Sequence, residues 1–250
     1  GSTAYAPLVE ALLTRWSVAG RILVVYELNG PIRFVHESDR EKVRESWLAW
    51  RTGFDSNQLA IKRMLAQGKL KSDLDLIGQA FDTNLEKSIG SPTRAFEVLR
   101  QMCLCSRTSL NGKPVLPEDL VIVIEAAALA IPEAPLPQMR DADRQRVSIC
   151  QDRFSDPGFT EGGDSVLLLS ESRSLIHQRI AQLPQLLEVP VPAPDVSDRD
   201  AFITWFASRD EVSAWGTHRE LAAATAGLSL HALQQLLKAA GHRREPLKRS

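Results

Sequence analysis

The sequence predicts an α/β fold, in which a mainly parallel sheet is sandwiched between helices and followed by an all-helical subdomain. Two observations predict the sheet. Short runs of residues are apolar throughout, which is typical of strands buried on both faces, and helical patterns separate these runs. A third observation predicts the subdomain, because only helical patterns remain after Pro190, Pro192 and Pro194.

The amino-terminal part is expected to contain a helix at 5–16, a strand at 21–27, a short strand at 32–36 that pairs back on it, and a helix at 38–50. Asn29, Gly30 and Pro31 supply the turn between the two strands. Ser38 and Glu41 have the spacing of a capping box, which predicts that the following helix begins at Ser38.

The middle of the chain contains the remaining strands. We expect two helices within 56–85 that are broken near Gly68, a helix at 92–105, a turn-rich stretch at 107–117, a strand at 120–124, a helix at 141–154, a strand at 165–170, a short helix at 175–183 and a short strand at 186–189. Pro92 suits the first turn of its helix.

Three helices are expected beyond the prolines, at 197–208, 217–226 and 229–240, with Thr217 and Ser229 as N-caps. The predicted domains are therefore an α/β core over 3–192, a helical lid subdomain over 193–241, and a basic tail or linker to a further domain over 242–250.

Composition narrows the class of protein. Of 250 residues, 44% are hydrophobic and 24% charged, and the net charge of −1 provides no global attraction for nucleic acid or an anionic membrane. The three cysteines cannot form an even disulfide framework, and no apolar run is long enough to span a bilayer. The histidines and cysteines have no metal-ligand spacing, so no metal site is expected. We expect a cytoplasmic protein with free thiols.

Polar residues follow two of the expected strands. Glu125 directly follows the strand at 120–124, and the strand at 165–170 ends in the polar cluster Ser170, Glu171, Ser172 and Arg173. Ligands of open α/β sheets bind beyond the carboxyl ends of the strands, so these side chains are expected to converge on one crevice.

This order of features resembles the AAA+ ATPase core. Leu120–Glu125 looks like a Walker B strand, and residues 165–180 look like the strand and turn that carry sensor 1. Residues 187–202 resemble the strand, connection and helix that open the helical lid, and residues 221–236 resemble the lid itself. The resemblance covers roughly 120–240 and implies an AAA+-like fold. It also implies that Glu125 is a remnant catalytic acid and that Ser172 and Arg173 lie where sensor 1 would meet nucleotide.

Three departures from the family pattern concern catalysis. Where a P-loop needs G-x-x-x-x-G-K-[ST], the chain has Leu28-Asn29-Gly30-Pro31-Ile32-Arg33. Ala126 follows Glu125 in place of a second acid, and Ser172 replaces the usual asparagine. A degenerate domain that binds no cofactor is therefore expected, with ATP and Mg²⁺ as ligands only if the chain is a divergent, working ATPase.

The resemblance implies protein partners, a homo-oligomer formed through AAA+ ring contacts, and a role in assembly or regulation beside an active AAA+ ATPase domain. One alternative is the divergent ATPase. Another is a DNA-binding regulator with a helix-turn-helix, in which Gly227 lies in the turn and His231, Gln234 and Gln235 lie on the recognition helix. Lys238 is the one cation among residues 229–238, so nucleic acid is not the favoured partner.

Overall fold

The computed structural model describes residues 5–65, 69–209 and 216–243. The chain divides into two compact units. The first, here called the α/β unit, is Leu8–Glu188, and the second, the helical unit, combines Gly1–Pro7 with Val189–Ser250. The expected break near Gly68 and most of the tail at 242–250 lie outside the described residues.

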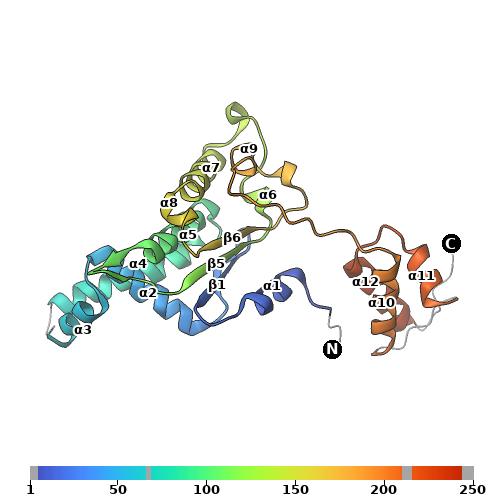
Figure 1. Ribbon diagram of the computed structural model, residues 1–250, viewed down its shortest axis with the longest axis horizontal. Coiled ribbons are helices and arrows are strands. Elements are labelled where there is room, and N and C mark those ends of the chain that lie inside the picture. Colours follow the sequence, from blue (N-terminus) through green and yellow to red (C-terminus); the bar gives the residue numbers. More distant parts are fainter. Residues whose placement is uncertain (1–4, 66–68, 210–215, 244–250) are drawn as a thin grey trace. The chain divides into compact units, whose positions relative to one another are not determined.

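A four-stranded sheet with the order β2-β1-β5-β6 forms the centre of the α/β unit (Figure 1). β1 (Arg21–Tyr26), β5 (Asp119–Ile124) and β6 (Ser165–Leu168) are parallel, and β2 (Ile32–Phe34) returns antiparallel to β1. The parallel sheet and the short returning strand are as the sequence predicts.

Helices cover one face of the sheet and build the main core. Alternate residues of β1 and β5, such as Ile22, Val24 and Ile122, are fully buried in a single apolar cluster with residues of the covering helices. These helices are α2 (Glu37–Thr52), α4 (Lys69–Ser88), α5 (Pro92–Arg107) and α7 (Asp141–Phe154). α3 (Ser56–Leu65) packs on α2 and α4 through Leu59, in a separate small cluster with Leu48, Ala49 and Leu74.

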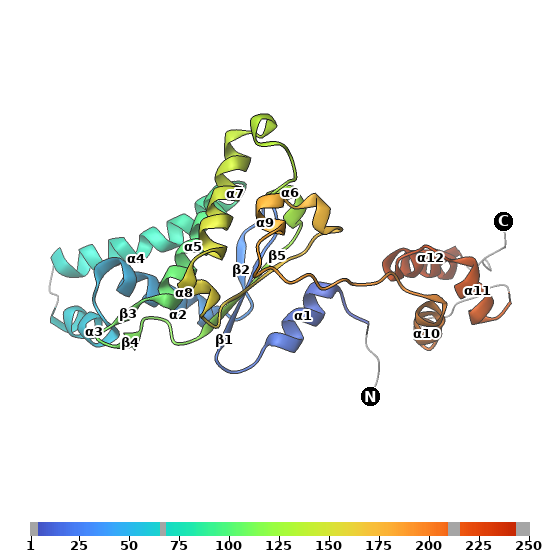
Figure 2. The same ribbon diagram turned by 45° about the horizontal axis from the view of Figure 1, so that its top comes forward.

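The other face carries the intervening residues of the same strands. Leu23, Val25, Val121 and Val123 are also buried. α1 (Leu8–Trp16) contacts β1 and lies on the other side of the sheet from α5 and α7 (Figure 2). The prediction of a sheet between helices is therefore confirmed.

Short elements connect the longer ones. They are the β3–β4 hairpin (Ser109–Leu110 and Lys113–Pro114), α6 (Ala127–Ala130), η1 (Leu136–Gln138), α8 (Pro157–Thr160), η2 (Arg173–Leu175) and α9 (Gln178–Ala181). The helix expected at 175–183 is thus reduced to the single turns η2 and α9.

Two local predictions are wrong. Helix α2 begins at Glu37 after His36, which makes no side-chain capping bond, so Ser38 is inside the helix and is not its N-cap. Residues 186–189 form no strand, and Leu187 and Val189 are 85% and 81% exposed. Their sequence has strand character, but their backbone pairs with none of the described strands.

The helical unit consists of α10 (Val196–Ala207), α11 (His218–Ala224) and α12 (Leu230–Arg243). Thr217 caps α11 through a capping box, and Ser229 Oγ accepts a hydrogen bond from the N–H of Ala232 at 3.1 Å, so both predicted N-caps are confirmed. Its core gathers residues of the three helices, namely Phe202, Ile203, Phe206, Leu221, Ala222, Leu233 and Leu237. Tyr5 packs edge-on against Phe202, so the amino-terminal segment belongs to this unit.

Candidate functional site

The carboxyl end of β1, where a P-loop would begin, is a tight turn that leads into a hairpin. The N–H of Gly30 donates to the carbonyl of Glu27 at 2.9 Å. Asn29 takes up the left-handed conformation, with φ of 64°, and its carbonyl accepts the N–H of Gly90 at 3.1 Å. Pro31 has no N–H. The turn therefore offers little of the free N–H array with which a P-loop surrounds phosphate.

The helix that follows this hairpin begins at the opposite end of the strands. Because β2 runs back along β1, α2 starts near the amino ends of the parallel strands, after the N–H of Val35 has bonded to the carbonyl of Leu23 at 3.1 Å. Its first turn carries Glu37 and Asp39. A helix N-terminus favours phosphate through its free N–H groups and dipole, but this one is turned away from the end of β1 and is already beside carboxylates.

Glu125 lies in a cluster with Glu27 and Arg33 at the carboxyl ends of β1 and β5. The register of the hairpin places Arg33 opposite Val25, and its Nη2 forms a close ion pair with Glu27 and a second one with Glu125 at 3.6 Å. The Glu125 side chain is 29% exposed, whereas Glu27 and Arg33 are about half exposed. A guanidinium thus lies between the two carboxylates, where a bound cation would otherwise neutralise them.

The environment of Glu125 disfavours its charged form. Partial burial and the nearby Glu27 carboxylate raise the pKa of Glu125, and Arg33 opposes this shift. Because the net shift of the pKa is upward, the favourable charge of Arg33 does not fully offset the effects of burial and of the Glu27 carboxylate on Glu125.

Ala126, directly after Glu125, has a strained backbone. Its φ of 50° and ψ of 44° place it in the left-handed region, which costs energy for a residue with a Cβ. The next N–H, of Ala127, donates to the carbonyl of Leu169 at 2.9 Å. The chain thus turns sharply from β5 into α6, and this turn sets the direction of Glu125.

Ser172 and Arg173, expected at the sensor 1 position, form local contacts. Ser172 caps η2 by accepting the N–H of Ser174 at 3.3 Å. Arg173 donates from Nε to the carbonyl of Ala181 at 2.9 Å and forms an ion pair with Glu188 at 3.4 Å. No hydrogen bond or ion pair joins either residue to Glu125 within the described parts of the chain. The side chains expected to converge on one crevice are therefore committed to two separate sets of contacts.

Sequence reasoning missed Arg33 and Glu27, the partners of Glu125. A usable signal was present, because Glu27 ends the first buried strand just as Glu125 ends the second. The position of Arg33 depends on the register of the β1–β2 hairpin, which apolar patterning alone does not specify at a three-residue strand.

Comparison with protein families gives two matches that together span nearly the whole chain. Residues 1–192 match the AAA+ chaperone, N-terminal Rossmann-like domain. The chain belongs to the AAA+ chaperone family. Residues 197–250 match the second helical domain of AAA+ chaperones, which corresponds to the helical unit. A comparison with curated proteins finds no match.

Two other sequence expectations concern ligands and membranes. Among the described residues of this AAA+ chaperone-family chain, no group of three or more His, Cys, Asp or Glu side chains is arranged to hold a metal ion. Within the same residues, no helix is long and apolar enough to cross a membrane.

The helix-turn-helix alternative also has a place in the structure. Gly227 lies between α11 and α12 with φ of 87°, as a turn glycine should. His231 and Gln235 are exposed on α12, and Gln234 is half-buried. Among the α12 side chains that the structure describes, however, Lys238 is the single lysine or arginine, which is a weak electrostatic footprint for binding to phosphates. The family match supports a chaperone helical domain for this segment.

Proposed function

We propose that this AAA+ chaperone-family chain is catalytically silent by itself and serves in assembly or regulation beside an active AAA+ ATPase domain. The observation that carries the proposal is Arg33, which is paired with both Glu27 and Glu125 at the carboxyl end of the central strands. An internal cation already neutralises part of the charge of these carboxylates, which leaves them less able to hold a catalytic metal.

Two physical arguments support the silent state. Phosphoryl transfer depends on positioning and electrostatic stabilisation by a phosphate-binding loop, a metal and charged side chains. Here the hairpin turn uses the N–H of Gly30 internally. The cluster of Glu27, Arg33 and Glu125 also has a net charge of −1 when ionised, which repels a polyphosphate rather than attracting it.

Calorimetric titration of the protein with Mg·ATP tests the proposal. We expect no heat of binding at up to millimolar nucleotide, for the wild type and for Glu125→Gln alike. Micromolar affinity that is lost in Glu125→Gln would overturn the proposal and establish the divergent ATPase. A steady-state hydrolysis assay with the same two proteins separates weak turnover by this chain from a contaminating ATPase, because only turnover by this chain depends on Glu125.

The remaining parts of the proposal concern partners and location. Family membership supports protein partners and assembly into oligomers. We propose that Glu125 on one side, and Ser172 with Arg173 on the other, are remnants of a nucleotide site whose parts now have separate contacts and hold no nucleotide. We place the protein in the cytoplasm, in keeping with three free, buried thiols among 250 residues.

A further inference from the structure

One edge of the sheet has no neighbouring strand among the residues that the structure describes. β6 is last in the order β2-β1-β5-β6. The N–H of Leu169 bonds to the carbonyl of Ile124 at 3.0 Å, and β6 pairs with β5 in parallel register. Because backbone groups of successive residues point to opposite edges, Val166 and Leu168 direct their N–H and C=O groups away from β5. Within the described residues no backbone or side-chain group bonds to them. Such an edge can accept a further strand.

An apolar groove, here called the edge groove, runs along these free backbone groups. It has a volume of about 350 Å³ and lies wholly within the α/β unit. Its apolar lining includes Trp16, Phe159, Leu183 and Leu186, together with β6 itself. A groove of this kind offers room for alternate side chains of an added strand while the strand bonds to the edge, as in β-strand addition.

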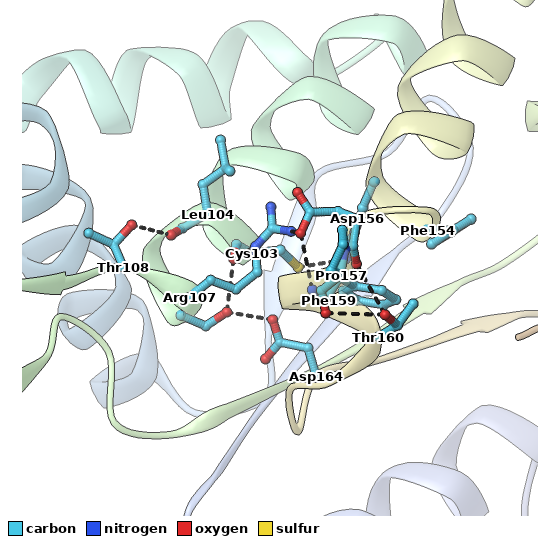
Figure 3. Close-up of polar contacts among 12 residues, drawn as sticks. Cys103, Leu104, Arg107, Thr108, Phe154, Asp156, Pro157, Phe159, Thr160 and Asp164 are labelled. Atoms are coloured by element: carbon cyan, nitrogen blue, oxygen red, sulfur yellow. Dashed lines mark hydrogen bonds and ion pairs between the residues drawn. The ribbon is translucent and has the colours of Figure 1, made fainter.

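Polar contacts hold one wall of the edge groove, formed by residues 159–164, in place (Figure 3). Asp156 caps α8 by accepting the N–H of Phe159 at 3.3 Å and forms an ion pair with Arg107 of α5 at 2.5 Å. Asp164, just before β6, accepts the hydroxyl of Ser106 at 2.5 Å and the N–H of Leu120 at 2.8 Å. Both ends of the wall are thus tied to α5 and β5, so a bound strand would not have to order the wall.

The chain also contains a segment with the pattern of an edge strand. Leu187, Val189 and Val191 alternate with Glu188, Pro190 and Pro192 over 187–192, and these three apolar side chains are 85%, 81% and 71% exposed. Proline cannot donate to a sheet, so it is confined to positions that face away from the neighbouring strand. Prolines at alternate positions leave the backbone groups of Leu187, Val189 and Val191 free to pair on one side, and they block further pairing on the other.

We propose that residues 187–192 of one copy of this chain add as a strand to the β6 edge of a second copy, filling its edge groove. The open edge and the proline-bearing segment are complementary. Each has backbone groups free to form hydrogen bonds with the other, and the exposed apolar side chains of the segment match the apolar lining of the groove. Apart from Leu187, the residues of the segment lie outside the lining of the groove, so the contact is head-to-tail, and repetition builds a ring or a filament.

The groove of the same copy is not the expected acceptor. Leu186 and Leu187 already form part of its lining. The next residue, Glu188, is held beside η2 by its ion pair with Arg173, beyond the carboxyl end of β6. The chain would have to reverse within Glu188–Pro190 to enter the groove that it borders.

The contact is expected to be weak when it is made once. A strand of six residues covers less than the roughly 1,200 Å² that stable interfaces usually bury. Association should therefore depend on protein concentration, and it should strengthen when a ring closes and each copy makes two contacts.

Sedimentation velocity of the whole chain over a range of concentrations tests the inference. We expect the wild type to assemble as its concentration rises and the double variant Val189→Asp/Val191→Asp to stay monomeric, with at least a tenfold weaker association. Met64→Asp is the matched control, because Met64 is 83% exposed on α3 and belongs neither to the segment nor to the lining of the groove. It should assemble as the wild type does.

A second measurement does not depend on any variant folding. A labelled peptide of residues 186–194 should bind to the wild type in fluorescence anisotropy and dissociate its assemblies, whereas the peptide with aspartate at 189 and 191 should not. Assemblies that neither the double variant nor the peptide affects would overturn the inference, and so would a monomeric wild type that does not bind the peptide.

This inference rests on the assembly role in the proposed function and not on catalytic silence. An oligomer insensitive to both perturbations refutes the strand contact but leaves assembly intact, and the Mg·ATP titration tests silence separately.

Discussion

Replacing Ala126 with glycine should stabilise the α/β unit, because Ala126 is the one alanine in a left-handed conformation among the described residues. Its φ of 50° and ψ of 44° bring the Cβ too close to the following carbonyl oxygen. That conformation costs an L-residue about 1–2 kcal/mol. Glycine removes this strain but adds about 0.5–1 kcal/mol of chain entropy in the unfolded state. The side chain is exposed, so its loss leaves no cavity.

The expected net gain in the free energy of unfolding is therefore about 0.5–1 kcal/mol, from the balance of these two effects. For a unit of this size it corresponds to a rise of about 1–4 °C in Tm. Urea unfolding followed by circular dichroism, with thermal unfolding beside it, measures both quantities on the transition of the α/β unit.

Asn29→Gly is the matched control, because Asn29 also has a positive φ, of 64°, but asparagine tolerates that region. Because Asn29 has little strain to release, this substitution should lower the free energy of unfolding by up to about 0.5–1 kcal/mol through chain entropy alone. A destabilised Ala126→Gly protein, or equal effects of the two substitutions, would refute the assignment of strain to Ala126 and with it the idea that this turn is held in place by the surrounding fold.

Three further predictions concern Glu125, Arg199 and the three cysteines. Glu125→Gln should raise the free energy of unfolding at pH 7 by less than about 1 kcal/mol, the size of effect expected for an exposed ion pair. Because the folded-state pKa of Glu125 is raised, the wild type recovers stability as pH falls through that pKa, so the advantage of the variant should shrink in acid. An advantage that grows in acid would contradict the direction of this pKa shift. Arg199→Met should lower the stability of the helical unit by about 2–4 kcal/mol, since the buried guanidinium donates to the carbonyls of Ala222 and Pro194 at 2.8 and 2.6 Å, and an unchanged urea midpoint for that unit would rule this out. Burial raises the pKa of Cys103, Cys105 and Cys150 to about 12, so a thiol reagent at pH 8 should label them only after denaturation, and rapid labelling of the native protein would show that they are accessible.

Elements that the sequence predicted well are those whose pattern depends on neighbours along the chain. α7, at Asp141–Phe154, has the predicted bounds, and β1 and β5 match within a residue because an apolar run flanked by turn residues identifies a buried strand by itself. Thr217 could be predicted as an N-cap from its residue type, and the structure adds a capping box with Glu220, a contact between residues three apart.

The failures occurred where residues distant in the sequence decide the outcome. Residues 186–189 have the composition of a strand, but a strand forms only where its backbone pairs with another strand, and these residues pair with none of the described strands. Similarly, Ser38 and Glu41 have the spacing of a capping box, yet α2 begins one residue earlier, after the chain leaves β2 at Phe34.

The sequence by itself determined the fold class of this protein and the loss of the phosphate-binding loop, because apolar periodicity and the residues after Glu27 are local properties. Only the tertiary structure decided what became of the acid at Glu125. The register of the β1–β2 hairpin brings Arg33 within 3.6 Å of Glu125, and the separate turns after β5 and β6 direct Glu125 and Arg173 to different partners. These contacts join residues up to 92 positions apart, as Arg33 and Glu125 are (125 − 33). Sequence patterns describe which face of an element is apolar, whereas ion pairs depend on where whole elements are placed.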